Sequence, residues 1–230
     1  MKKQWFVGCL LFVVMATNVV AKDNKLTRKE KKQGWELLFD GKTLNGWKNW
    51  NKELPVSGWT VEDGCLTTQG GGGDIVTLQD YGNFEFTFEW KIDENKNSGV
   101  MYHVKEGKQY CCPYMTGPEF QVFGDAHSPN RTKNSTASNY DMYIPATDMV
   151  LNPNGTWNKA TIIYKDGKVE HWVNGKKVVA FDEWSDDFNV RYKASKWSSA
   201  PDYAKFKTGK ISLQDHGDPV QYKNLKIRKL

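Results

Sequence analysis

The sequence predicts an all-β protein, a two-sheet antiparallel jelly-roll sandwich. Strand-length runs alternate apolar and polar residues, turn dipeptides separate them at short intervals, and no long helical period appears after residue 34. Aromatic residues make up 13% of the chain, with ten tryptophans. Side chains of this size suit two sheets that pack face to face over one core.

The chain opens with the pattern of a secretory signal peptide. A basic start is followed by an apolar run, Trp5–Met15, and by the small residue Ala21. The run is too short to span a bilayer. We expect cleavage after Ala21 and export of the mature protein to the periplasm or cell surface, without stable membrane insertion. A retained membrane anchor is the alternative.

The remaining chain is expected to form a charged linker, residues 22–33, and a single domain, residues 34–230. The net charge of +5 falls to +3 when Lys2 and Lys3 leave with the signal, and much of the remainder lies in Lys25–Lys32. The body is therefore nearly neutral. This balance gives no indication of nucleic-acid binding.

Three cysteines remain in the mature chain: Cys65, Cys111 and Cys112. Exported proteins form disulfides, so Cys65 could bond to one member of the adjacent pair. The odd count leaves at least one thiol over. Neither these cysteines nor the histidines show the spacing of a zinc site.

The expected strands follow one another along the whole domain. Asx-Gly dipeptides predict tight hairpins between several of them, at Asp63-Gly64, Asp166-Gly167 and Asn174-Gly175. Loops are expected at 105–116, 124–139 and 182–208, of which 124–139 is long enough to be functional or disordered. In order, the strands or hairpins are expected at 35–39, 59–68, 84–92, 100–104, 119–123, 157–164, 168–173, 176–181, 210–218 and 220–228.

Four consecutive glycines, Gly70–Gly73, stand before Asp74. No Lys-Ser/Thr pair follows, so the run does not match a phosphate-binding loop. Glycine adopts backbone conformations closed to other residues. The run therefore predicts either a flexible turn or backbone that approaches a ligand closely.

The run Phe84–Ile92 shows the clearest strand pattern. Four large aromatic residues share one face, because side chains alternate along a strand. The polar residues of the run, Glu89 among them, share the other. The aromatic set, expected in the core, is Phe84, Phe86, Phe88 and Trp90.

The stretch Thr116–Phe123 is the leading candidate for a ligand-binding strand. Glu119 and Gln121 lie on one face and alternate with the apolar Phe120 and Val122. The carboxylate and the amide are two residues apart, about 7 Å. Such a face suits a sugar-sized polar ligand; a strand whose polar face is merely solvated is the alternative.

Further polar residues are expected to line one concave face together with this strand. Alternation nominates Glu89 and the pair Gln214 and His216, although the last two could simply satisfy backbone groups in a turn. His103 could line the same cleft, whereas the face of His171 is ambiguous. The expected substrate-binding residues are Gln121, Gln214, Asn97, His103 and Tyr140.

Seven motifs follow one another along the domain: Leu38–Trp47, Trp59–Gly64, Tyr81–Phe86, Asn97–Val100, Gly117–Gln121, Glu170–Gly175 and Ile211–Gly217. Together they resemble the 3-keto-disaccharide hydrolase domain family, which is common in Bacteroidetes. The resemblance spans residues 34–230 and implies a concanavalin-like jelly roll, the fold of lectins and glucanases. It also implies action on glycosides whose sugar is oxidised at C3.

The implied chemistry starts at the proton on C2, which a ketone at C3 acidifies. A base could remove it, the aglycone would leave C1 by elimination, and water would add back. We expect the base to be Glu119 or His171, and Glu89 to act as the acid or to orient a partner. His216, with Gln214 or Gln121, would donate hydrogen bonds to the enolate.

A divalent metal could replace these donors as the electrophile, although no ligand spacing requires one. The suitable ligand types are Glu89, Glu119, His171 and His216. A 3-keto substrate also implies a sugar oxidoreductase that acts upstream.

Two other functions fit the same residues. The first is a conventional glycoside hydrolase with Glu89 and Glu119 as paired carboxylates, about 5 Å apart for retention or roughly 6.5–9.5 Å for inversion. The second is a non-catalytic carbohydrate-binding module, which would use stacking aromatic residues and amides without turnover.

Overall fold

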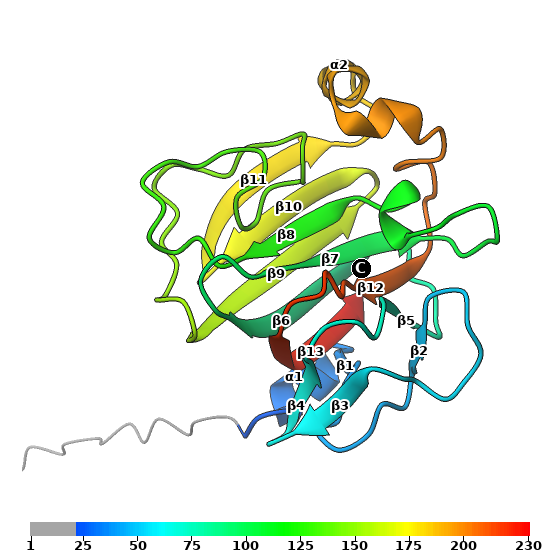
Figure 1. Ribbon diagram of the computed structural model, residues 1–230, viewed down its shortest axis with the longest axis vertical. Helices are drawn as coiled ribbons and strands as arrows, with labels where there is room; N and C mark the ends of the chain where they lie inside the picture. The colour runs from blue at the N-terminus through cyan, green and yellow to red at the C-terminus, as the bar shows by residue number, and fades with distance from the viewer. Residues whose placement is uncertain (1–21) are drawn as a thin grey trace, which may run out of the picture.

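The structure is a computed structural model and describes residues 22–230. The predicted signal peptide lies outside the described residues. Two antiparallel sheets pack face to face, with α2 at one end (Figure 1). The prediction of an all-β jelly roll is confirmed. Within residues 22–230, no helix is long and apolar enough to cross a membrane.

The larger sheet has eight strands, and the smaller sheet has five. In spatial order the larger sheet contains β11 (Lys176–Asp182), β10 (Lys168–Val173), β9 (Trp157–Lys165), β6 (Phe84–Ile92), β13 (Val220–Lys229), β4 (Cys65–Thr68) and β3 (Trp59–Glu62), with β1 (Glu36–Leu37) paired to β13. The smaller sheet contains β2 (Trp47–Asn49), β5 (Ile75–Thr77), β12 (Lys210–Leu213), β7 (Asn97–Val104) and β8 (Glu119–Phe123).

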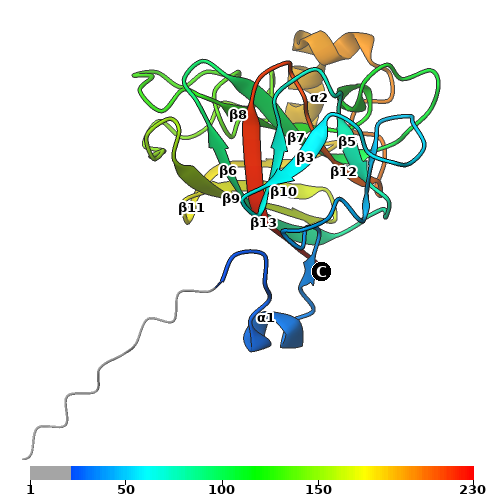
Figure 2. The ribbon, with the colours of Figure 1, turned by 60° about the horizontal axis from the view of Figure 1, so that its bottom comes forward.

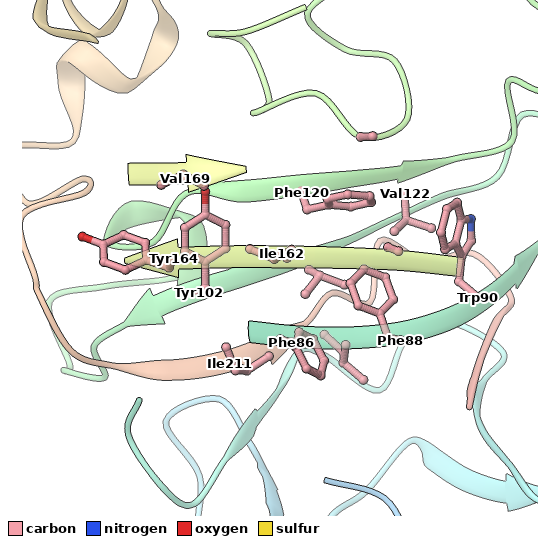
Figure 3. Close-up of a cluster of buried hydrophobic side chains, with 14 of the residues drawn as sticks. Phe86, Phe88, Trp90, Tyr102, Phe120, Val122, Ile162, Tyr164, Val169 and Ile211 are labelled. Carbon is pink, nitrogen blue, oxygen red and sulfur yellow. The ribbon is translucent and has the colours of Figure 1, made fainter. Parts of the chain in front are cut away.

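The core lies between the two sheets and is dominated by aromatic rings (Figure 3). On β6, buried and partly exposed residues alternate along the whole strand, as the sequence predicted. Phe88 meets Phe120 of the opposite sheet edge-to-face, with ring centroids 5.4 Å apart. Because each strand turns every second residue toward this layer, its other residues are directed to the outer face of its own sheet.

The three predicted Asx-Gly hairpins are confirmed. In each of them both central residues have positive φ, the combination that a two-residue type I′ turn requires. Asp and Asn tolerate this region better than most residues with a side chain, and glycine adopts it freely. The φ values are 49° and 75° at Asp63-Gly64, 51° and 83° at Asp166-Gly167, and 47° and 85° at Asn174-Gly175.

The segment 182–208, expected as loop, contains α2 (Asp186–Ala194) and the 3₁₀ helix η2 (Lys196–Ser199). The α2 helix starts where the Ser185 hydroxyl accepts the Phe188 N–H, and Phe188 is its one buried residue. A helix with a single buried residue lacks the apolar stripe that reveals helices in a sequence. The N-cap residue Ser185 was the sequence feature that could have predicted the start of this helix.

The expected linker 22–33 contains a short helix, α1 (Arg28–Lys32), which lies outside the sandwich (Figure 2). A capping box joins Thr27 and Glu30 at its start. Glu30 also accepts a hydrogen bond from Lys226 of β13 at 2.7 Å. Part of the charged segment is therefore attached to the larger sheet rather than merely solvated.

The three cysteines of the described chain are free thiols. Cys65 is buried on β4 of the larger sheet, whereas Cys111 and Cys112 precede η1 (Pro113–Met115). The disulfide that the sequence allowed between Cys65 and this pair is not formed. The aromatic core, and not a crosslink, stabilises the fold.

We expect Phe88→Ala to lower the free energy of unfolding by about 3–5 kcal/mol, because it removes a fully buried ring from the centre of the core. Urea denaturation would measure the change. As a control, Val190→Ala should stay within about 0.5 kcal/mol of the wild type, because Val190 is 67% exposed. Equal effects of the two substitutions would contradict this description of the core.

Candidate active site

The outer face of the smaller sheet carries a row of polar residues. Gly99 pairs with Gln121 across β7 and β8, and the Gln214 N–H donates to the Gly99 carbonyl at 2.9 Å. Asp74 immediately precedes β5, whose Ile75 pairs with Leu213 of β12. Because Ile75 and Leu213 belong to the core, the neighbouring Asp74 and Gln214 lie on the outer face.

Glu119 leans along the sheet over Gly99. A Cβ at Gly99 would collide with Oε1 of Glu119, so the missing side chain provides the space that the carboxyl occupies. Glu119 is only 4% exposed. When the Gln121 amide is oriented to satisfy its surroundings, its nitrogen donates to Glu119 Oε1 and to the Ser98 carbonyl, both at 3.1 Å.

The free edge of β8 is covered by the segment 137–140. Its Ala137 N–H donates to the Gln121 carbonyl at 2.8 Å, and its Tyr140 N–H donates to the Glu119 carbonyl at 3.1 Å. The loop that the sequence left as functional or disordered thus packs along the edge strand. This cover contributes to the burial of Glu119.

Burial raises the pKa of Glu119 to about 8. The positive charge of Lys196 opposes part of this rise, and the negative charge of Asp74 adds to it. A carboxyl group with this pKa is mostly protonated at neutral pH. Glu119 can therefore donate a proton under conditions in which ordinary carboxyl groups cannot.

Asp74 is a second carboxyl group on this face, and it was not among the site residues predicted from the sequence. Its Oδ1 accepts the Asp215 N–H at 2.8 Å. Burial, together with the charge of Asp215, raises the pKa of Asp74 to about 6. The sequence feature that could have pointed to Asp74 is its position directly after Gly70–Gly73, a run for which close approach of the backbone to a ligand was one of the two predictions.

The glycine run approaches a carboxylate of the chain itself. The N–H groups of Gly71, Gly72 and Gly73 donate to the Asp215 side chain at 3.1, 2.5 and 2.9 Å. Asp215 therefore anchors the loop that leads into Asp74. The backbone of the run approaches Asp215 of the chain itself, and approach to a ligand, which the sequence suggested, stays a prediction.

Lys196, in η2, is a second residue that the sequence did not reveal. Its ammonium lies over the rings of Tyr140 and Trp197, 4.2 and 4.4 Å from their centroids. Tyr114 lies 6.0 Å away. No motif marks this lysine, because Tyr114 and Tyr140 come from distant segments of the chain and only Trp197 is its sequence neighbour.

Four of the sequence-predicted residues gather at this site: Glu119, Gln121, Asn97 and Gln214. The Gln121 and Asn97 side-chain amides lie 3.2 Å apart. Gln214 is buried, and its Oε1 has no hydrogen-bond partner within the described part of the chain. Tyr140, also predicted, lies beside them under Lys196.

Glu89 does not belong to this group, and its expected place on a shared face was wrong. It lies on β6 of the larger sheet, on the face opposite to the buried Phe88. Its carboxylate accepts a hydrogen bond from Asn224 at 3.0 Å and pairs with Lys223 at 3.8 Å. The aromatic core separates it from Glu119.

His171 and His103 were expected at the cleft but lie in the core. His171 is fully buried; its Nδ1 is 2.9 Å from the Ala137 carbonyl and its Nε2 is 3.3 Å from the Tyr102 hydroxyl. His103 Nε2 is 2.9 Å from the Gly82 carbonyl. Burial lowers the pKa of both histidines to about 4, so both are neutral at pH 7.

His216 is exposed and lies in the irregular segment after β12, two residues beyond Gln214. The four residues considered as metal ligands therefore occupy different parts of the molecule: Glu119 on the smaller sheet, Glu89 on the larger, His171 in the core and His216 in this segment. Within residues 22–230, no group of three or more His, Cys, Asp or Glu is placed to hold a metal ion. These residues do not fit a shared metal site.

The sequence model of the 3-keto-alpha-glucoside-1,2-lyase-like domain matches residues 34–228. The chain belongs to this family. A protein named 3-keto-disaccharide hydrolase, from Bacteroides thetaiotaomicron, is 33% identical over an alignment of 229 residues. The match covers 86% of this chain and 79% of that protein. The family resemblance of the seven motifs is confirmed.

Solved structures agree with this family assignment. A crystal structure from Parabacteroides distasonis, described provisionally as a glycosyl hydrolase, is 45% identical with a TM-score of 0.84, and covers 91% of this chain and 100% of its own. A second, similarly described structure from the same organism is 27% identical with a TM-score of 0.65, covering 86% and 84%. Together, the family and its members support a glycoside hydrolase-type function.

We expect Gly99→Ala to move the Glu119 carboxyl out of its buried position and to lower its pKa toward the ordinary value, because the new methyl group takes the space of Oε1. Carbon-13 NMR titration of the labelled carboxyl would measure the shift. Gly82→Ala is the matched control, since a Cβ there makes an ordinary contact of 3.4 Å. An unchanged titration of Glu119 in Gly99→Ala would contradict this geometry.

Proposed function

We propose that the protein cleaves glycosides whose sugar carries a ketone at C3, and that it does so on the outer face of the smaller sheet. The family and the name of the Bacteroides relative support this substrate class. The observation that carries the proposal is the pair of carboxyl groups on this face, Asp74 and Glu119, whose pKa values lie on either side of neutrality. Such a split assigns a base and an acid.

The reaction has two stages. In the first, a base removes the proton from C2, the electron pair is delocalised onto the C3 oxygen as an enolate, and the aglycone leaves C1 with a proton from an acid. In the second, water adds across the resulting C1=C2 bond. The sum consumes one water molecule and releases the free keto sugar and the aglycone alcohol.

The pKa values assign these roles differently from the sequence, which proposed Glu119 or His171 as the base. At pH 7, a carboxyl with a pKa of about 6 is mostly ionised and one with a pKa of about 8 is mostly protonated. Asp74 is therefore the base, and Glu119 is the acid that protonates the leaving group. His171 is enclosed in the core and takes no part in the reaction.

The distance between Asp74 and Glu119 along the row of polar residues is compatible with one acting as base and the other as acid. Asp74 and Gly99 are separated by β12, which is two strand spacings or roughly 10 Å between Cα atoms. Gln214, which follows β12, is the residue between them, and its side chain is buried. A single pyranose ring could span the distance between the Asp74 and Glu119 carboxyl groups.

The two alternative functions receive less support. Glu89 and Glu119 are on opposite outer faces of a sandwich whose sheets pack about 10 Å apart, beyond the roughly 6.5–9.5 Å of an inverting pair. A binding module would use the aromatic faces at this site to stack a sugar. The faces of Tyr140 and Trp197 are instead occupied by the Lys196 ammonium.

The cellular setting forms part of this proposal. The N-terminal pattern favours export to the periplasm or cell surface. A 3-keto glycoside must be made by oxidation of a secondary alcohol, so a sugar oxidoreductase acts before this protein.

We expect the protein to release the aglycone from a 3-keto glucoside and not from its unoxidised parent, because only the ketone acidifies the C2 proton. Chromatography of the released alcohol would measure both reactions. Comparable cleavage of the parent would contradict elimination chemistry. Inertness toward both sugars, with measurable binding, would leave a binding module.

We expect Glu119→Gln to slow release of an alkyl aglycone by about 10²–10⁴-fold, because an alkoxide needs a proton to depart. Release of 4-nitrophenolate should slow far less, since this leaving group needs no acid. Glu170→Gln, on the larger sheet, should match the wild type with both substrates. Equal losses of Glu119→Gln on the two substrates would contradict the acid role.

The rate should depend on pH as a bell. It should rise as Asp74 ionises at a pKa of about 6 and fall as Glu119 loses its proton at about 8. Profiles of kcat/KM for an alkyl 3-keto glucoside would show both limbs. Asp74→Asn should remove the acidic limb and most of the activity, whereas Asp148→Asn, at an exposed surface position, should change neither. An acidic limb that persists in Asp74→Asn would exclude Asp74 as the base.

A further inference from the structure

The Lys196 ammonium is held in place by aromatic rings. Tyr140 and Trp197 lie within 4.4 Å of it, and Tyr114 forms the third side of this cage. Trp197 is fixed in turn, because its indole N–H donates to the Tyr140 carbonyl at 2.8 Å. The rings therefore position the cation by their faces, and the exposed side of the ammonium remains open to a ligand.

No carboxylate of the described residues pairs directly with this ammonium, although the charges of Glu119 and Asp141 both act on it. Among residues 22–230, the ammonium of Lys196 takes part in no ion pair within 4.0 Å and in no hydrogen bond. The neighbouring Asp141 carboxylate pairs with Lys133 and accepts the backbone N–H of Lys196. Glu119, the other nearby carboxyl, is mostly protonated at neutral pH.

Lys196 lies close to Glu119, because both contact Tyr140. The charge of Lys196 opposes the raised pKa of Glu119, and Glu119 acts in the opposite sense on Lys196, whose pKa burial lowers. Tyr140 connects the two, since its ring lies under the ammonium and its N–H bonds to the Glu119 carbonyl. Among the described residues the two side chains form no ion pair within 4.0 Å, so a substrate oxygen could approach the ammonium without displacing Glu119.

We infer that Lys196 receives the C3 oxygen of the substrate and stabilises the enolate that forms when the C2 proton leaves. This inference rests on the proposed function, because it names the residue that recognises the ketone. A fixed ammonium stabilises a developing oxyanion far more than a neutral hydroxyl. Lys196 would therefore select the oxidised sugar over its parent.

The test compares Lys196→Met, Lys196→Arg and Lys193→Met, with 4-nitrophenyl 3-keto glucoside as substrate. The nitrophenolate leaving group needs no acid, so its release reports on enolate formation. We expect Lys196→Met to lower kcat by about 10²–10³-fold with a smaller change in KM. Lys196→Arg should restore part of the loss, because it returns a cation to the cage. Lys193→Met, at an exposed position on α2, should match the wild type.

Equilibrium binding provides a second measurement that does not depend on turnover. In the Glu119→Gln background, Lys196→Met should weaken binding of the 3-keto glucoside and leave binding of the unoxidised glucoside unchanged. A kcat of Lys196→Met within twofold of the wild type, or equal weakening for both sugars, would overturn the inference. Failure of the wild-type protein to turn over any 3-keto glucoside would instead overturn the proposed function.

Discussion

The site depends on one packing constraint, the absence of a side chain at Gly99. The Glu119 carboxyl lies in the space that a Cβ would fill, and the segment 137–140 covers the strand edge beside it. Removal from water raises the pKa of a carboxyl group. One missing methyl group and one covered edge thus convert an ordinary surface carboxylate into a proton donor at neutral pH.

The aromatic layer decides which polar residues can act together. Phe88 and Phe120 meet between the sheets, so the residues beside them point to opposite outer faces. Glu89 is next to Phe88 and Glu119 is next to Phe120, so the two carboxyl groups lie on opposite outer faces and do not share a site. Glu119 and Asp74 instead lie on the same outer face of the smaller sheet, in a row of polar residues that crosses β7 and β12. Lys196 belongs to η2, which lies outside the two sheets.

The sequence predicted most of the strands, although not β2 and β5, together with the three Asx-Gly hairpins and the outward direction of Glu119 and Gln121, because a period of two determines which face a side chain takes. It could not tell which sheet a strand joins, and this failure placed Glu89 beside Glu119. It did not identify Asp74 and Lys196 as site residues, because Asp74 follows a glycine loop and Lys196 belongs to η2, a short 3₁₀ helix with one buried residue. His171 alternates with Glu170 and Trp172, and the structure buries His171 while the other two stay partly exposed.

In the proposed function, a 3-keto sugar binds on the outer face of the smaller sheet, between Asp74 and Glu119. The most direct measurement is a crystal structure of Glu119→Gln in complex with an alkyl 3-keto glucoside. The account predicts C2 of the sugar beside the Asp74 carboxylate, the glycosidic oxygen beside residue 119 and the C3 oxygen toward Lys196. A sugar bound on the larger sheet, beside Glu89 and Asn224, would contradict it.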